Sequence, residues 1–168
     1  MRDNVIAIFA ISDNEAYNHL YEFLGRDYIN TKLKEKGLHP LQISHRLESE
    51  NAESPNTKPT IFRTSDSMNY MQSSILGSQT EPIKLNRLQK GKGFCKNDTL
   101  ANAPMDFSKK NYLPISTLHD MMKRVQFPKA FELKNQFILN DKDQEFLLDI
   151  IKIVPRTVGY YQDEYYDD

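Results

Sequence analysis

The chain alternates between short apolar runs and polar segments, and the spacing of the apolar residues predicts its elements. Residues 5–11 form a continuous, β-rich apolar run and predict a buried first strand. Ser12 and Glu15 follow with the spacing of a capping box, which predicts a helix that begins here and ends at Gly25. Residues 26–36 predict a second helix, or a continuation of the first.

The middle of the chain predicts three further strands and one helix. Residues 41–47 alternate between apolar and polar side chains, with His45 on the apolar face, and residues 60–64 and 82–88 also predict strands. A helix over residues 66–77 is predicted between the last two. The predicted order β-α-β-β-α-β is that of a ferredoxin-like core. The sequence therefore predicts a small mixed α+β domain with such a core, followed by helices.

The last third of the chain predicts two helices separated by an extended segment. Residues 89–111 have no sustained period and predict a long loop. Ser116 has the position of a cap for a helix that ends before Pro128. Residues 131–139 predict a strand or an extended core segment, and residues 141–154 predict a helix that anchors the core.

Composition limits the class of protein. A chain of 168 residues with 27% charged residues is long enough for one domain, which we place at residues 1–158, followed by an acidic, tyrosine-rich tail at 159–168. The single cysteine, Cys95, excludes an intrachain disulfide and fits a reducing compartment. No apolar run has the length of a signal peptide or a membrane span. We therefore predict a soluble, cytoplasmic protein without a membrane partner, and export by a signal-independent route stays open.

Charge is segregated along the chain although the formal net charge is only −1. Residues 83–110 contain seven basic and two acidic residues. A glycine- and lysine-rich loop of this kind can follow a phosphate backbone. The candidate nucleic-acid contacts are Lys84, Arg87, Lys90, Lys92 and Lys96. A solvated loop is the favoured interpretation, because no nucleic-acid-binding motif accompanies these residues and their glycine spacing is not that of a phosphate loop.

The tail is the candidate protein-binding segment. It combines four tyrosines with four acids, a composition suited to a basic groove on another protein. The candidate partner-binding residues are Tyr160, Tyr161, Asp163, Glu164, Tyr165, Tyr166, Asp167 and Asp168. Two alternatives stay open: a disordered terminus, and a segment that folds back onto the lysine-rich loop.

Candidate catalytic residues are few. His39 and His45, with Lys90 or Lys92, could support metal-free cleavage of a phosphodiester, but a structural role is favoured for His45 on its apolar face. Lysines beside Cys95 favour a reactive thiolate, yet no signature of a catalytic cysteine is present. No histidine or cysteine spacing matches a metal site, and no cofactor motif occurs.

The absence of a catalytic motif and the acidic tail favour a non-enzymatic binding protein: an inhibitor, an immunity protein, an antitoxin-like factor or an adaptor. Its expected partner is a protein with a basic surface, with charge steering their association. The alternative is a nucleic-acid-binding protein or small nuclease that uses residues 84–110 and the two histidines. No catalytic residue, metal or cofactor is assigned, and whether the protein is an enzyme stays open.

Overall fold

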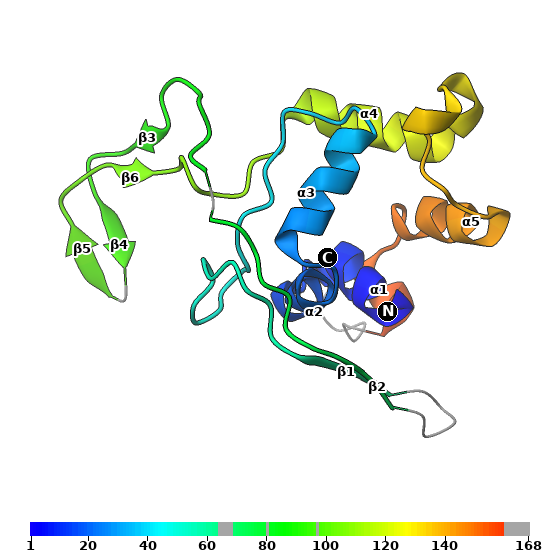
Figure 1. The fold of residues 1–168 in the computed structure, drawn as a ribbon, viewed down its shortest axis with the longest axis horizontal. Coiled ribbons are helices and arrows are strands. Elements are labelled where there is room, and N and C mark those ends of the chain that lie inside the picture. Colours follow the sequence, from blue (N-terminus) through cyan, green and yellow to red (C-terminus); the bar gives the residue numbers. More distant parts are fainter. Residues whose placement is uncertain (64–68, 80, 97, 160–168) are drawn as a thin grey trace, which may run out of the picture.

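The computed structural model describes residues 1–63, 69–79, 81–96 and 98–159 (Figure 1). These residues form five α-helices and six short strands, which pair into three two-stranded antiparallel sheets. The helices are α1 (Arg2–Ile11), α2 (Asn14–Leu24), α3 (Arg26–Glu35), α4 (Ile115–Gln126) and α5 (Asp141–Ile150). The strands are β1 (Thr60–Arg63), β2 (Asn69–Gln72), β3 (Gln89–Lys90), β4 (Phe94–Lys96), β5 (Thr99–Ala101) and β6 (Met105–Asp106). The predicted mixed α+β class is confirmed.

The chain begins with a helix where a strand was predicted. In α1 the small residues Ala7 and Ala10 are buried, three positions apart on one face, and α1 packs against α2. Phe9, on another side of α1, is 50% exposed. An apolar run of seven residues suits a strand or a buried helix equally well, and here the neighbouring helix decides between them. Three helices therefore precede the first strand, and the ferredoxin-like order is not observed.

The turn between α1 and α2 differs from the predicted capping box. Ser12 has φ 56°, and its backbone N–H donates to the Ile8 carbonyl at 3.1 Å, so it closes α1. Asp13 is the N-cap of α2, because its carboxylate accepts the backbone N–H of Ala16 at 2.8 Å. The predicted stop is confirmed: Gly25, with φ 73°, ends α2 and precedes α3.

The middle of the chain contains hairpins. The predicted strand at residues 60–64 forms as β1, which pairs with β2. Part of the predicted helix at 66–77 is β2 instead, and residues 64–68 lie outside the described part of the chain. Residues 41–47 form one isolated bridge, between Gln42 and Tyr112, instead of the predicted strand, and the predicted strand at 82–88 does not form.

Residues 83–96 and 98–108 form an arm, named here the β-arm, that projects from the helices (Figure 1). It carries the β3–β6 and β4–β5 pairs in the region predicted to be a long loop. Its base is closed where the Ile83 N–H donates to the Ser108 carbonyl at 2.7 Å, and the Phe107 N–H donates to the Leu88 carbonyl at 3.0 Å.

The C-terminal helices form close to their predicted places. Pro114, not Ser116, is the N-cap residue of α4, which buries Thr117 and Arg124. Asn140 caps α5, but α5 ends at Ile150, four residues before the predicted end. The segment at 131–139 contains the 3₁₀ helix Leu133–Asn135 rather than a strand.

That segment is also not core as predicted, because Leu133 is 84% and Ile138 95% exposed. Two further 3₁₀ helices, Pro128–Ala130 and Pro155–Val158, follow α4 and α5. Among the described residues, no helix is long and apolar enough to cross a membrane.

Candidate functional site

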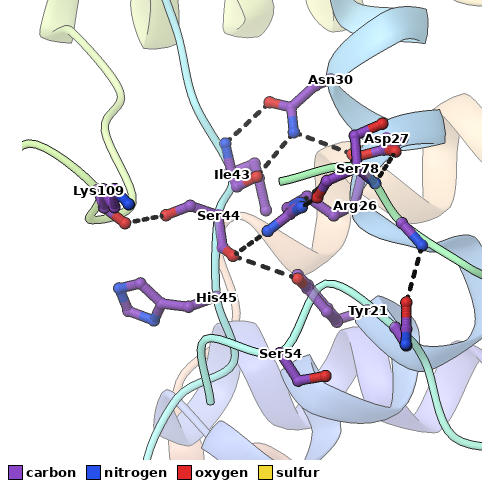
Figure 2. Close-up of polar contacts among 12 residues, drawn as sticks. Tyr21, Arg26, Asp27, Asn30, Ile43, Ser44, His45, Ser54, Ser78 and Lys109 are labelled. Carbon is purple, nitrogen blue, oxygen red and sulfur yellow. Dashed lines mark hydrogen bonds and ion pairs between the residues drawn. The ribbon is translucent and has the colours of Figure 1, made fainter. Parts of the chain in front are cut away.

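The segment at residues 43–45 is fixed by buried polar contacts from several elements (Figure 2). Arg26, at the start of α3, is 4% exposed, and its guanidinium donates to the carbonyls of Ser44 and Ser78. The Asn30 side-chain amide accepts from the Ile43 N–H at 2.9 Å and donates to the Ile43 carbonyl at 2.7 Å. Because buried polar groups need partners, these bonds leave the segment little freedom.

Asn111 holds the same segment from the other side. Its Oδ1 accepts the backbone N–H groups of Ser44 at 2.7 Å and His45 at 3.0 Å, and its Nδ2 donates to the His45 carbonyl at 3.1 Å. His45 Nδ1 lies 2.6 Å from the Arg46 carbonyl, and Nε2 accepts the Asn111 N–H at 3.4 Å. A carbonyl only accepts and an N–H only donates, so these two contacts fit the tautomer that carries its proton on Nδ1. Both nitrogens of His45 therefore have structural partners.

Arg46 organises the following residues, 46–58, into a compact loop that we call the Arg46 loop. The Arg46 side chain is 3% exposed and binds both carboxylate oxygens of Glu22, with Nε–Oε1 at 2.5 Å and Nη2–Oε2 at 3.0 Å. Its guanidinium also donates to the carbonyls of Ser54 at 3.0 Å and Asn56 at 2.7 Å. One buried cation thus joins α2 to two points of the loop.

Glu22 is the anionic partner of this arrangement. Besides Arg46, it accepts the backbone N–H of Lys58 at 2.6 Å. Burial alone would raise the pKa of the Glu22 carboxyl, but the hydrogen bonds from Arg46 and Lys58, with the charge of Arg46, outweigh burial and lower this pKa below its ordinary value. Glu22 is therefore held ionised and serves the loop as a counter-charge.

Asn18 fixes the first residues of the loop against α2. Its side-chain amide donates to the Leu47 carbonyl at 2.7 Å and accepts the Leu47 N–H at 2.8 Å, as a paired strand would. The next residue, Glu48, is exposed and has φ 43°, in the left-handed region that non-glycine residues seldom adopt. Such backbone strain persists only where the surroundings impose it, and it clusters at functional sites.

A cavity of about 780 Å³ lies between α2, the start of α1, the Arg46 loop and β1; we call it the α2 pocket. Its charged and polar lining includes Asn14, Glu15, Asn18, His19, Glu22, Arg46, Glu48 and Lys58. Its apolar lining includes Leu20, Phe23, Ile61 and Phe62. The Phe23 and Phe62 rings meet edge to face with centroids 4.9 Å apart. The pocket can thus hold an organic molecule with both apolar and polar groups.

Metal binding has no support in the described residues, where no group of three or more His, Cys, Asp and Glu side chains is placed to hold an ion.

The residues predicted to form sites are not brought together. The tail residues 160–168 lie outside the described residues, and their role stays a prediction. Lys84, Arg87, Lys90 and Lys92 are exposed on the β-arm, and Lys96 ends β4 there. His39 instead lines a cavity beside α4, and His45 is bound to Asn111, so the predicted histidine and lysine constellation does not form. Cys95 is exposed in β4.

Comparison with known proteins decides the class of this chain. A family model described as "Beta-lactamase enzyme family" matches residues 1–152. The chain belongs to this family. No match was found among curated proteins or among solved structures. The prediction of an inhibitor, immunity protein, antitoxin-like factor or adaptor is therefore wrong, because the family is one of enzymes. The alternative of a nucleic-acid-binding protein gains no support from it.

The β-lactamase family draws attention to the tripeptide Ser12-Asp13-Asn14. S-D-N is one of three short motifs of class A β-lactamases and penicillin-binding proteins, along with S-x-x-K and K-T-G. In this chain the motif occupies the turn between α1 and α2, where Ser12 is exposed, Asp13 caps α2 and Asn14 lines the α2 pocket. Sequence reasoning assigned Ser12 and Glu15 to a capping box and missed this signal.

Neither S-x-x-K nor K-T-G occurs in residues 1–168. The candidate site consists of the S-D-N turn and the α2 pocket, which Asn14 joins.

Proposed function

We propose that the chain catalyses hydrolysis of a β-lactam or a related strained cyclic amide in the α2 pocket. The observation that carries the proposal is that Asn14 of the S-D-N turn and Glu48 of the Arg46 loop line one pocket, in a chain of the β-lactamase family. The family name supplies the substrate class, and the pocket supplies groups that can move protons and orient an amide.

Three side chains have proposed roles. The Glu48 carboxylate takes a proton from a water molecule, whose oxygen bonds to the amide carbon. The C–N bond then breaks, and Ser12, exposed beside Asn14, relays the proton that Glu48 took from the water to the departing nitrogen, which leaves Glu48 ionised and Ser12 protonated again. The Asn14 side-chain amide hydrogen-bonds to the substrate and orients it. The proposed pathway uses water as the attacking group and assigns no acylated serine.

Packing around the pocket supports these roles. Asn18 of α2 binds Leu47, and Arg46 of the loop binds Glu22 of α2. The residues just before Glu48 are therefore fixed against α2. Fixing the backbone in this way contributes to catalysis because it reduces the ordering that the Glu48 side chain still needs. The single cysteine remains the basis for predicting a cytoplasmic location.

The purified protein is expected to hydrolyse a chromogenic cephalosporin faster than the buffer alone. Intact-mass spectrometry during turnover is expected to show the unmodified protein mass, because the proposed pathway forms no covalent intermediate. A rate equal to that in buffer, across penicillins and cephalosporins, would contradict the proposed activity. A stoichiometric adduct on a serine would contradict the assignment of water as the attacking group.

A further inference from the structure

A second cavity, away from the α2 pocket, lies between the segment that follows α3 and the first three turns of α4. Its volume is about 370 Å³. From the turn it is lined by Leu38, which is 1% exposed, and by His39. From α4 it is lined by Ser116, His119 and Lys123. His119 and Lys123 are four positions apart, so they share one face of the helix.

Charge in this cavity is unevenly balanced. Asp120 is its carboxylate, and it is paired with Arg124 at 2.8 Å and with Lys123 at 3.4 Å. The charge of Asp120 is thus balanced by two cations, of which Lys123 lines the cavity and Arg124 lies outside its lining. Arg124 is 5% exposed, and its Nε is a buried donor with no hydrogen-bond partner among the described residues. A buried cation of this kind raises the local positive potential because solvent screens it poorly.

The cavity does not have the ligands of a metal site. Its two imidazoles and one carboxylate are not among the described groups placed to hold an ion, and the carboxylate is already bound to two cations. What remains is a set of donors: two imidazoles, an ammonium and the Ser116 hydroxyl. Donors that converge from two elements suit a tetrahedral oxyanion, which accepts hydrogen bonds from several directions.

We infer that this cavity binds a phosphate group, with His39 on one side and His119, Lys123 and Ser116 on the other. The site is separate from the proposed hydrolytic site, since the residues that line the two cavities do not overlap. It joins the end of α3 to α4, where Arg124 already holds the Lys36 and Asn135 carbonyls. A bound phosphate would add a further link across that junction.

The test is a titration of the protein with inorganic phosphate, followed through the imidazole NMR signals in a phosphate-free chloride buffer at about pH 6, within the range where imidazoles gain a proton. Signals of His39 and His119 are expected to shift along one saturation curve. His119→Gln and His39→Gln are each expected to weaken binding about tenfold, since each removes one hydrogen bond to a charged group. His19→Gln, a matched exposed histidine in the α2 pocket, is expected to leave binding unchanged.

Four outcomes would overturn the assignment. Imidazole signals that do not move with phosphate would show that no site exists. A shift of His19 on the same curve would show a general ionic effect. If acetate binds as tightly as phosphate, the cavity does not select phosphate and its ligand is a carboxylate. If zinc shifts the NMR signals of both imidazoles and phosphate does not, the cavity is a metal site.

Discussion

Replacement of Arg46 by methionine is expected to lower the free energy of unfolding by about 3–5 kcal/mol, the usual cost of removing one partner of a buried ion pair. Arg46 is 3% exposed and holds both oxygens of Glu22, so its loss leaves a carboxylate buried without its cation. The Ser54 and Asn56 carbonyls lose their donors at the same time. The Arg46 loop should therefore open even where the helices remain folded.

Urea denaturation of the purified variant measures this loss as a lower midpoint. Arg87→Met on the β-arm is the matched control, because Arg87 is exposed, and it should change stability by no more than about 0.5 kcal/mol. If Arg46→Met does not fold, Arg46→Lys keeps the charge without the paired geometry and should still lower the midpoint. An Arg46→Met midpoint equal to that of the wild type would show that the ion pair does not hold the loop.

Replacement of Glu48 by glutamine is expected to lower kcat for β-lactam hydrolysis by about 10²–10⁴-fold, the usual contribution of a general base. Glutamine has nearly the same shape but cannot accept a proton from water. The Glu48 side chain is exposed, and the structure shows no hydrogen bond to it among the described residues. The thermal midpoint and the KM of the variant should therefore stay close to those of the wild type.

Glu50→Gln provides the matched control for this measurement. Glu50 is an exposed carboxylate of the same loop, but it lines a different cavity with Arg46 and Asn56. Its replacement should leave kcat unchanged. Equal losses in both variants would point to the charge of the loop rather than to a base, and an active Glu48→Gln enzyme would remove Glu48 from the mechanism.

Local signals in the sequence predict part of this structure. Helices α2, α3, α4 and α5 form close to where apolar spacing and glycines place them, because amphipathic period acts within a few residues, although Asp13 and Pro114 rather than the predicted serines precede α2 and α4. The run at residues 5–11 could not be assigned in this way. Its apolar residues satisfy a buried strand or a buried helix, and only packing of Ala7 and Ala10 toward α2 favours the helix.

Most of the candidate site depends on contacts between distant residues. Asn111 binds Ser44 and His45 across more than sixty positions, and Arg46 finds its partner in Glu22, which lies on a helix earlier in the chain. A local sequence pattern does not predict which polar residue becomes buried, because its partner lies far away in the chain. The S-D-N tripeptide stands in the sequence, but a serine before an acid and an asparagine also suits a helix start, so the tripeptide alone does not mark a site.

The most direct test of the central claim, that the α2 pocket is the site where this β-lactamase-family chain binds its substrate, is a map of backbone amide NMR shifts during titration with a penicillin. The amides of Asn14, Glu15 and Asn18 on α2, and of Leu47 and Glu48 on the Arg46 loop, are expected to show the largest changes, on one saturation curve. If the largest shift changes occur on the β-arm or in the tail, and the signals of these five amides do not shift, the account is contradicted.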